Sequence, residues 1–270
     1  MSRSGYYAWK KSREAREERR RRFDDDVRRV FDSGEGVYGA GRICGMLRKE
    51  GIKASFERVS DSMRRQGMKS IHLKRRQRAL TNSTKARGDG YENLVKGMEI
   101  VRPFQVLCSD ISYIRTQEGF AYLCVVKDVA SGTILSTSMS DRMEAEFVLD
   151  AIRKALKSWK LPSETIFHSD RGSRYTSSLV TGYLSRNGIR QSFSGVGKPG
   201  DNSWSESFFS VLKKEAVHWV HFRTRGEAFE AMFVYIQGFY NTRRAQERLD
   251  YLSPLQWLED WYFKNSIEAA

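Results

Sequence analysis

The sequence predicts an α/β protein in which a mixed sheet is packed by helices and preceded by a small all-α module. Three alternating apolar runs, separated by short polar turns, follow one another between residues 104 and 139, as the strands of an antiparallel meander do. Helical and strand patterns then alternate along the chain. Before residue 70, apolar residues recur at helical spacing within a strongly basic region. We therefore expect two regions that differ in fold and in partner.

Positive charge is concentrated in the first third of the chain. The 270 residues carry a formal charge of +14, and residues 1–90 hold 25 Lys and Arg against 12 Asp and Glu. Residues 91–270 hold 22 against 21, so this part is almost neutral. A basic block of this kind is typical of a nucleic-acid-binding segment, although a solvated basic tail would have the same composition.

The cysteines and the apolar runs indicate the compartment. Cys44, Cys108 and Cys124 are odd in number and widely separated, which indicates free thiols in a reducing environment. No apolar run reaches the roughly 18 residues that a membrane span needs. Arg and Glu crowd the N-terminus, where a signal peptide would be apolar. We expect a cytoplasmic protein with no membrane partner.

The basic region is expected to contain a three-helix module. Apolar residues at i, i+3 and i+4 spacing begin at Val27 and again at Ile43, with a glycine-containing break between them. Ser55 is suited to cap a third helix that runs to Gln66. Two short helices joined by a tight turn form the helix-turn-helix pattern, whose second helix enters the major groove of DNA. A plain three-helix bundle is the alternative. The DNA contacts expected on the third helix are Arg58, Arg64 and Arg65.

The remaining pattern predicts the order of elements in the core. The expected strands are 104–114, 120–129, 133–139, 165–169 and 189–193, and the expected helices are 143–159, 177–186, 204–217 and 228–240. Their order is that of the RNase H-like fold. The expected boundaries are a basic arm over 1–23, a helix-turn-helix-like module over 24–70, a basic linker over 71–100, the core over 101–223 and a helical extension over 224–270.

Three acidic residues are placed to converge at one edge of this sheet. Asp110 lies in the middle of the first strand, where burial is costly unless a partner or a cation compensates the charge. Asp170 follows the fourth strand, and Glu206 begins the helix after a glycine-rich loop over 195–201. Three carboxylates form an oxygen-only site suited to Mg²⁺ or Mn²⁺. Two such ions about 3.5–4 Å apart can activate the attacking oxygen and stabilise the leaving oxygen in phosphoryl transfer.

Each acid also has a purely structural interpretation. Asp170 could terminate its strand by accepting backbone hydrogen bonds, as Asp does in turns. The pattern Ser203-x-x-Glu206 fits a helix capping box. Asp110 could pair with a nearby basic side chain. The candidates for that pairing are Arg115 and Lys127.

Two long motifs resemble those of a known family. The segment 168–177, HSDRGSRYTS, resembles the second-Asp motif of bacterial insertion-sequence transposases with an integrase core. The segment 197–209, GKPGDNSWSESFF, resembles the segment that carries their Glu, and the 35 residues between Asp170 and Glu206 agree with the family's D-D-35-E spacing. Shorter similarities occur at Tyr38–Ile43, Tyr240–Arg244 and Tyr251–Pro254.

The resemblance implies a DNA-cutting and DNA-joining enzyme. Similar proteins are second-reading-frame products whose full transposase arises by frameshifting. They nick donor DNA to expose a 3′ hydroxyl and use it to attack another phosphodiester, without a covalent protein–DNA intermediate. By this resemblance Asp110, Asp170 and Glu206 are catalytic and bind two Mg²⁺ or Mn²⁺ ions. The implied partners are double-stranded DNA of the element ends and target, further copies of the chain on DNA, and an upstream-frame product with additional DNA-binding and multimerisation segments. Such a protein is expected on the bacterial nucleoid when it acts.

The resemblance also suggests DNA contacts in the core. Lys213 lies seven residues after Glu206 and therefore on the same helix face, where integrase-type enzymes contact DNA. Lys214 and Arg171 are further expected contacts, although a basic helix end also complements the macrodipole. Leu107–Ser109 departs from the family, which has Trp and Thr before the first Asp, and so does Gly41. A DNA-binding remnant or regulator, and an RNase H-type nuclease without strand transfer, are the alternative functions.

Overall fold

The structure is a computed structural model that describes residues 2–72, 91–195 and 199–268. The expected basic linker therefore lies outside the described residues between 73 and 90, and so do residues 196–198 of the glycine-rich loop. The chain forms two compact units. One comprises residues 1–75 and 245–252, and the other comprises residues 76–244 and 253–270.

The first unit is helical, as expected. Its helices are α1 (Arg3–Ser33), α2 (Ala40–Lys49) and α3 (Phe56–Arg65). The expected arm and the first module helix are one continuous helix, α1, which buries only its second half, beginning at Phe23. The hydroxyl of Ser55 accepts a hydrogen bond from the Arg58 N–H at 3.2 Å, which confirms Ser55 as the N-cap of α3.

A short segment from the far end of the chain, residues 245–252, completes this unit. It contains the 3-10 turn η4 (Glu247–Leu249). The Ala245 N–H donates to the Tyr38 hydroxyl at 2.9 Å. The Tyr251 ring occupies the space beside Gly45, where an added Cβ would lie 2.0 Å from ring atom Cζ. Asp250 and Tyr251 both have positive φ values, +52° and +59°, a conformation that non-glycine residues adopt only when their surroundings enforce it.

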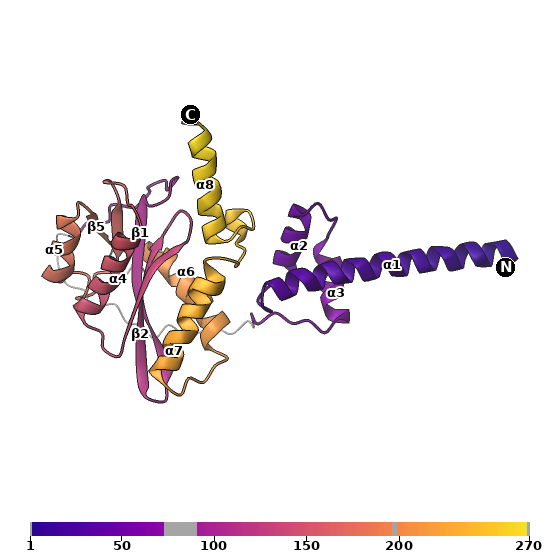
Figure 1. The fold of residues 1–270 in the computed structure, drawn as a ribbon, viewed down its shortest axis with the longest axis horizontal. Helices are drawn as coiled ribbons and strands as arrows, with labels where there is room; N and C mark the ends of the chain where they lie inside the picture. Colours follow the sequence, from indigo (N-terminus) through magenta and orange to yellow (C-terminus); the bar gives the residue numbers. More distant parts are fainter. Residues whose placement is uncertain (1, 73–90, 196–198, 269–270) are drawn as a thin grey trace. The chain divides into compact units, whose positions relative to one another are not determined.

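The second unit is built on a five-stranded sheet (Figure 1). The strands are β1 (Val106–Thr116), β2 (Gly119–Asp128), β3 (Ile134–Ser140), β4 (Ile166–Ser169) and β5 (Arg190–Phe193), and their order is β3-β2-β1-β4-β5. The first three strands pair antiparallel, and β4 and β5 are parallel to β1. This confirms the meander and the RNase H-like order.

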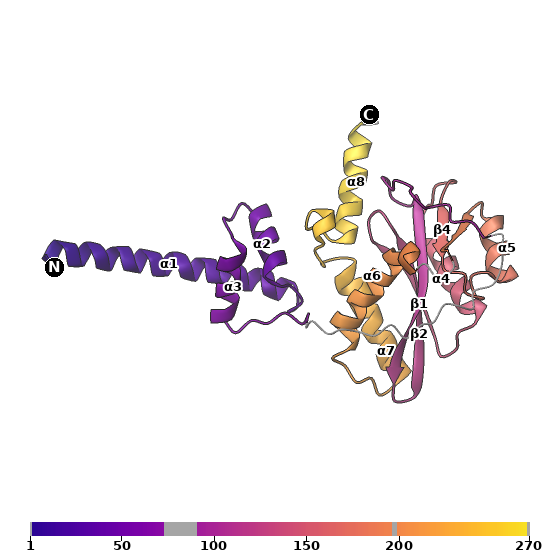
Figure 2. The same cartoon turned by 180° about the vertical axis from the view of Figure 1, so that it is seen from behind.

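Helices cover both faces of the sheet (Figures 1 and 2). The helices after the meander are α4 (Ala145–Ser158), α5 (Ser178–Arg186), α6 (Ser203–Leu212), α7 (Arg225–Phe233) and α8 (Pro254–Glu268). The main core joins α4 and α5 to one sheet face through Ile152, Val180 and Leu107. Helix α6 packs on β1 from the other side and follows the 3-10 turn η1 (Pro199–Asn202). Among the helices of the described residues, none is both long and apolar enough to cross a membrane.

Two expected helices change form before they end. The helix expected over 204–217 is α6 followed by the π-helical turn η2 (Lys213–Val217). The helix expected over 228–240 is α7 followed by the π-helical turn η3 (Val234–Tyr240). A buried ion pair joins them, because the Arg244 guanidinium after η3 donates to both carboxylate oxygens of Glu215 in η2, at 2.8 and 2.7 Å. The Tyr235 hydroxyl also donates to Glu215, at 2.6 Å.

Candidate active site

The register of the central strands brings two of the predicted carboxylates to one end of the sheet. The parallel pairing of β1 with β4 ends at Cys108 opposite His168. Asp110 and Asp170 each lie two residues beyond that last pair. Because the strands run in the same direction, both acids stand at the same edge. Asp110 is half-buried and Asp170 is exposed.

Backbone amides orient both carboxylates. Oδ1 of Asp110 accepts from the Ile111 N–H at 2.8 Å, and Oδ1 of Asp170 accepts from the Gly172 N–H at 3.0 Å. The second bond is the turn contact expected for Asp170. An added Cβ on Gly172 would lie 2.9 Å from Oδ1 of Asp170, closer than real Cβ atoms approach. The turn therefore requires a glycine at position 172 to leave this carboxylate in place.

Glu206 is exposed in the first turn of α6 and does not take part in a capping box. The N-cap residue is Asn202, which makes no side-chain capping bond, and Ser203 is already the first helical residue. A capping box needs Ser203 outside the helix at the N-cap, so that alternative is wrong. The reason is that η1 leads directly into α6 and shifts the start of the helix by one residue.

Two hydrogen bonds fasten the beginning of α6 to the sheet. The Asn202 side-chain amide donates to the Ser109 carbonyl at 3.3 Å. The buried Lys127 ammonium donates to the Trp204 carbonyl at 2.8 Å. Lys127, which the sequence offered as a partner of Asp110, therefore holds the helix that carries the third predicted carboxylate.

The charges of the other two predicted carboxylates act on Asp110. Burial, reinforced by the negative charges of Asp170 and then Glu206, raises the pKa of Asp110 to about 7. The charge of Lys213 opposes this shift. Burial lowers the pKa of Lys213, and the charge of Asp110 counteracts that effect. The Lys213 ammonium also lies 4.9 Å from the ring centroid of Tyr113. Lys213 therefore lies within electrostatic reach of Asp110, and Lys214 follows it in η2.

The donor set suits a hard divalent cation. Within residues 2–72, 91–195 and 199–268, no three His, Cys, Asp or Glu side chains are arranged closely enough to form a metal site. Asp110, Asp170 and Glu206 offer only carboxylate oxygens, the ligands that Mg²⁺ and Mn²⁺ prefer. Burial first, and then the charges of Asp170 and Glu206, raise the pKa of Asp110, and a bound cation would oppose all of these effects.

A buried histidine that the sequence did not single out organises the loop before α6. Nδ1 of His168 is 2.9 Å from the Ser192 hydroxyl, and Nε2 is 3.1 Å from the Asp201 carbonyl. A carbonyl can only accept, so Nε2 carries the proton in this network. Burial lowers the pKa of His168, which keeps the ring neutral. The ring therefore links β4 to the residues that lead into α6. A histidine inside a buried strand was the only available signal.

A second buried contact connects the two aspartate-bearing segments. The Ser109 hydroxyl is 2.8 Å from the Tyr175 hydroxyl, and both side chains are buried. Ser109 precedes Asp110 on β1, while Tyr175 lies in the turn after Asp170. Ser109 belongs to the stretch in which the chain departs from the family pattern, so this departure is accommodated by a specific hydrogen bond.

Arg171, the other core residue predicted to contact DNA, has partners within the fold. Its Nε donates to the Ser194 carbonyl at 2.8 Å, and a terminal nitrogen donates to the Tyr91 carbonyl at 3.0 Å. These bonds fasten the segments before β1 and after β5 to the turn beside Asp170. Contact of Arg171 with DNA stays a prediction.

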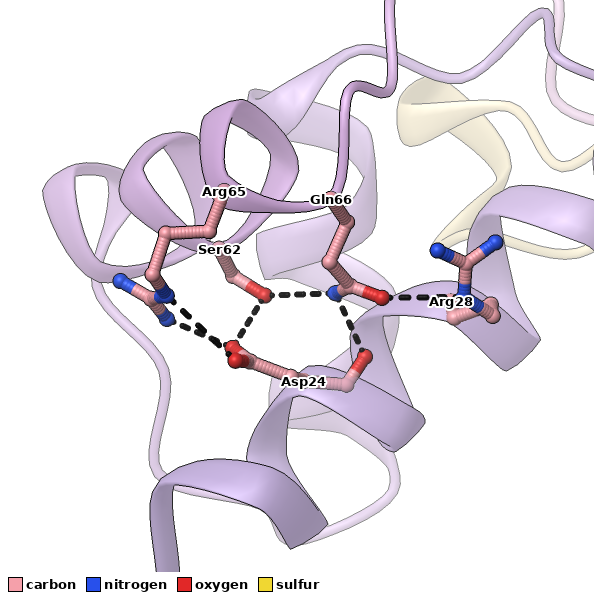
Figure 3. Close-up of polar contacts among 5 residues, drawn as sticks. All are labelled: Asp24, Arg28, Ser62, Arg65 and Gln66. Atoms are coloured by element: carbon pink, nitrogen blue, oxygen red, sulfur yellow. Dashed lines mark hydrogen bonds and ion pairs between the residues drawn. The ribbon is translucent and has the colours of Figure 1, made fainter. Parts of the chain in front are cut away.

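The three arginines expected to contact DNA from α3 also have partners within their unit. Arg65 donates to both carboxylate oxygens of Asp24, at 2.6 and 3.4 Å (Figure 3). Arg58 stacks its guanidinium 3.7 Å from the ring centroid of Phe23. Arg64 pairs with Asp61 at 3.0 Å within the helix. Their role in DNA binding stays a prediction.

Figure 3 also shows how α1 and α3 are joined by side chains around Asp24. The Ser62 hydroxyl donates to Asp24 Oδ1 at 2.6 Å, and the Gln66 amide donates to the Asp24 carbonyl at 2.8 Å. Arg28 completes the cluster by donating to the Gln66 carbonyl oxygen at 2.9 Å. This network fastens α3 to α1 by side-chain hydrogen bonds.

The family matches define the class as an integrase-type polynucleotidyl transferase of the DDE superfamily. Residues 101–199 and 206–260 match two families that are both described as an integrase core domain, and residues 18–77 match an HTH-like domain. A chain of the simian T-cell lymphotropic virus intasome, in complex with PP2A regulatory subunit B56 gamma, shares the fold. Its TM-score is 0.50 at 14% identity, over 80% of this chain and 70% of that one.

Sequence relatives narrow the class to a family. A transposase for insertion sequence element IS904 of Lactococcus lactis subsp. lactis (strain IL1403) is 36% identical over 238 residues, which cover 85% of this chain and 90% of the relative. Transposase InsF for insertion sequence IS3A of Escherichia coli (strain K12) is 36% identical over 262 residues, or 95% of this chain and 90% of the relative. The chain belongs to the IS3-type insertion-sequence transposases with an integrase core domain.

Membership of this family establishes the general activity. The chain is a transposase that acts in DNA transposition, and the integrase core depends on divalent metal. Transposases act on DNA. The helix-turn-helix-like module expected from the sequence is confirmed as an HTH-like domain.

Proposed function

We propose that Asp110, Asp170 and Glu206 are the catalytic carboxylates with which this transposase cuts DNA at the ends of its insertion sequence and joins the freed 3′ hydroxyl to target DNA. The observation that carries the proposal is the parallel register of β1 and β4, which places Asp110 and Asp170 at one edge of the sheet, where burial and the charges of Asp170 and Glu206 raise the pKa of Asp110. A half-buried carboxylate under that repulsion is costly to the fold, and its location at the strand ends suits a catalytic role.

The three carboxylates would hold two Mg²⁺ or Mn²⁺ ions. Such ions supply Lewis acidity that activates an attacking oxygen and stabilises a leaving one. The chain itself contributes the positions of the three carboxylates. Asp110 and Asp170 are held by the Ile111 and Gly172 amides, and Glu206 is held by the fastening of α6 to β1 and β2.

Basic side chains around the carboxylates would position the DNA backbone. Lys213 is within electrostatic reach of Asp110, so its ammonium would contact a phosphate near the bond that is cut. Lys214 and Arg171 would contact the DNA further away. Phosphate contacts of this kind fix the register of the duplex without reading its sequence. In the first unit, Arg58, Arg64 and Arg65 would contribute to the binding of the element ends.

The proposed partners follow from the reaction. The protein would bind the element ends and target DNA as an oligomer of identical chains, and associate with the bacterial nucleoid when it acts. An upstream-frame product would supply further DNA-binding and multimerisation segments, as the resemblance to transposases made by frameshifting implies. The catalytic function is proposed for residues 101–223, and the DNA-binding function for residues 24–70.

The test uses full-length Asp110→Asn and Glu206→Gln variants with DNA that carries the element's ends. Both should lose cleavage and strand transfer in Mg²⁺ and in Mn²⁺, while their affinity for DNA is retained. Glu230→Gln, which changes an exposed acid on α7, is the matched control and should be active. Undiminished strand transfer by both variants would overturn the assignment. A wild-type protein that binds DNA without cutting it would indicate a regulator.

A further inference from the structure

One stripe of side chains runs along α1, and its members are exposed in the first half of the helix and buried in the second. Its members are separated alternately by four and three residues, the spacing that keeps side chains on one face of a helix. In order they are Trp9, Arg13, Arg16, Arg20, Phe23, Val27 and Val30. The last three are buried against the rest of the unit, whereas the first four are exposed. The face that packs on α2 and α3 therefore continues beyond them as an arginine stripe.

No position of the arginine half of the stripe is occupied by an acidic residue. Glu14 and Glu18 lie on other faces of the helix, and Glu17 borders the stripe beside Arg13. Arg13 donates to Glu17 at 2.9 Å in an exposed pair and stacks 5.5 Å from the Trp9 ring centroid. Exposed pairs of this kind contribute little energy, so Arg13 can exchange Glu17 for a stronger anionic partner.

The stripe meets two arginines of α3 at its inner end. Arg58 stacks on Phe23, and Arg65 pairs with Asp24, the two residues that follow directly after Arg19–Arg22. Burial acts to raise the pKa of Asp24, but hydrogen bonds from Arg65 and Ser62 outweigh it and keep the pKa low. The charge of Arg20 acts in the same direction, so Arg20 lies within electrostatic reach of this cluster.

The outward face of α3 carries acidic side chains. Its exposed residues include Glu57 and Asp61, and the one arginine among them, Arg64, is paired with Asp61. A polyanion approaching this face would meet two carboxylates. The surface formed by α1 and the α1-facing arginines of α3 contains neither Glu57 nor Asp61, and the carboxylate next to its α3 arginines is Asp24, which pairs with Arg65.

The same spacing argues against a helical protein partner. A coiled-coil partner requires apolar side chains at the positions separated by four and three residues. Here three successive positions of that kind are arginines, and their burial in a helix pair would leave uncompensated charges. Arginine is instead suited to phosphate, which it binds with paired N–H donors.

We propose that Arg13, Arg16 and Arg20, together with Arg58 and Arg65, form a continuous surface that binds the phosphate backbone of duplex DNA along α1. The span from Arg13 to Arg20 is roughly 10 Å, which matches the axial rise of about three phosphates of one strand. This inference rests on the proposed function for its ligand, element DNA, but it assigns the main phosphate contacts to α1 and not to the outer face of α3.

The experiment compares two full-length triple variants that each lose three positive charges from α1. The first is Arg13→Ala/Arg16→Ala/Arg20→Ala. The second, the control, is Lys10→Ala/Lys11→Ala/Arg21→Ala, whose side chains are exposed and off the stripe. Binding to a duplex of the element's end, and to an unrelated duplex of equal length, is measured at several salt concentrations. Circular dichroism checks that both variants keep the helical content of the wild type.

The stripe variant should bind both duplexes at least 10-fold more weakly, and its plot of log affinity against log salt should be shallower by about 2 to 3. The control should change that slope by less than about 1. Equal losses in the two variants would show that net charge alone matters and would overturn the inference, as would unchanged binding by the stripe variant. Metal-dependent cleavage by the wild type tests the proposed function separately, because it does not depend on which face of α1 binds DNA.

Discussion

Asp110 illustrates how far a single residue can be interpreted from sequence. An Asp within an apolar strand is costly, so its position alone indicated a compensating partner or a functional site. His168 and the pair Ser109–Tyr175 were not predicted, because their importance depends on partners that lie 24 to 66 residues away. For Glu206 the sequence also allowed a helix-capping role. Only the position at which α6 begins in the structure excluded that role.

The raised pKa of Asp110 predicts how stability depends on pH in metal-free protein. The folded state holds the proton to about pH 7, whereas the ordinary value is 3.8. Between these values the folded state binds more protons than the unfolded state, so stability falls as pH rises through this window. Asp110→Asn removes the effect and should therefore be more stable than the wild type at pH 8, with the difference vanishing near pH 4.

Urea unfolding in the presence of a chelator measures this difference at the two pH values. Asp141→Asn, at an exposed residue, is the control and should follow the wild type at both. A variant Asp110→Asn that is no more stable than the wild type at pH 8 would show that the carboxylate is not strained by its surroundings.

Gly172 is expected to control the geometry of Asp170. Gly172→Ala places a Cβ 2.9 Å from Oδ1 of Asp170 and should displace that carboxylate. We expect strand transfer to fall on the order of 10-fold or more, since small displacements of a catalytic group are costly. The stabilisation by Mg²⁺ in thermal unfolding should weaken as well. Gly182→Ala, whose Cβ would meet only the flexible end of Arg186 at 3.3 Å, is the matched control. Equal activity of the two variants would contradict this account.

At the scale of elements, periodicity predicted the strands and their order but not the form of the helix ends. Alternation and turn residues are local signals, and β1 to β5 lie within a few residues of the expected ranges. The π-helical turns η2 and η3 are stabilised by the Glu215–Arg244 pair, whose members are 29 residues apart. No local pattern contains that information, so the sequence indicated two uninterrupted helices.

The buried Glu215–Arg244 ion pair leads us to predict how substitutions at these two positions change the stability of the core. Arg244→Met leaves a buried carboxylate without its cation and should destabilise the core by about 3–5 kcal/mol. The double variant Arg244→Met/Glu215→Gln removes the uncompensated charge and should recover much of that loss. Chemical unfolding of the four proteins in the cycle gives the coupling. Additive losses in the double variant would show that the two side chains do not stabilise η2 and η3 as a pair.

At the scale of the whole molecule, the sequence separated a basic helical region from an α/β core but did not predict that residues 245–252 belong to the helical unit. The chain leaves the second unit after Arg244, contributes this segment to the first unit, and returns at Ser253. The contacts join residues about 200 positions apart, such as Lys49 with Asp250. Only the structure can reveal such pairs. The two positive φ values at Asp250 and Tyr251 indicate that the packing of Tyr251 beside Gly45 is strong enough to hold a strained backbone.

This packing predicts that the effect of Gly45→Ala on the stability of α2 changes sign when the Tyr251 ring is removed. In the wild-type chain, Gly45→Ala should destabilise α2, because the new Cβ would lie 2.0 Å from the Tyr251 ring. In a Tyr251→Ala background the space is open, and the same substitution should stabilise α2 by up to about 1 kcal/mol, since alanine is the better helix former. Hydrogen exchange of the α2 amides in the four full-length proteins measures both effects. If Gly45→Ala has the same effect in both backgrounds, then Tyr251 does not occupy this site in solution, and residues 245–252 do not belong to the helical unit.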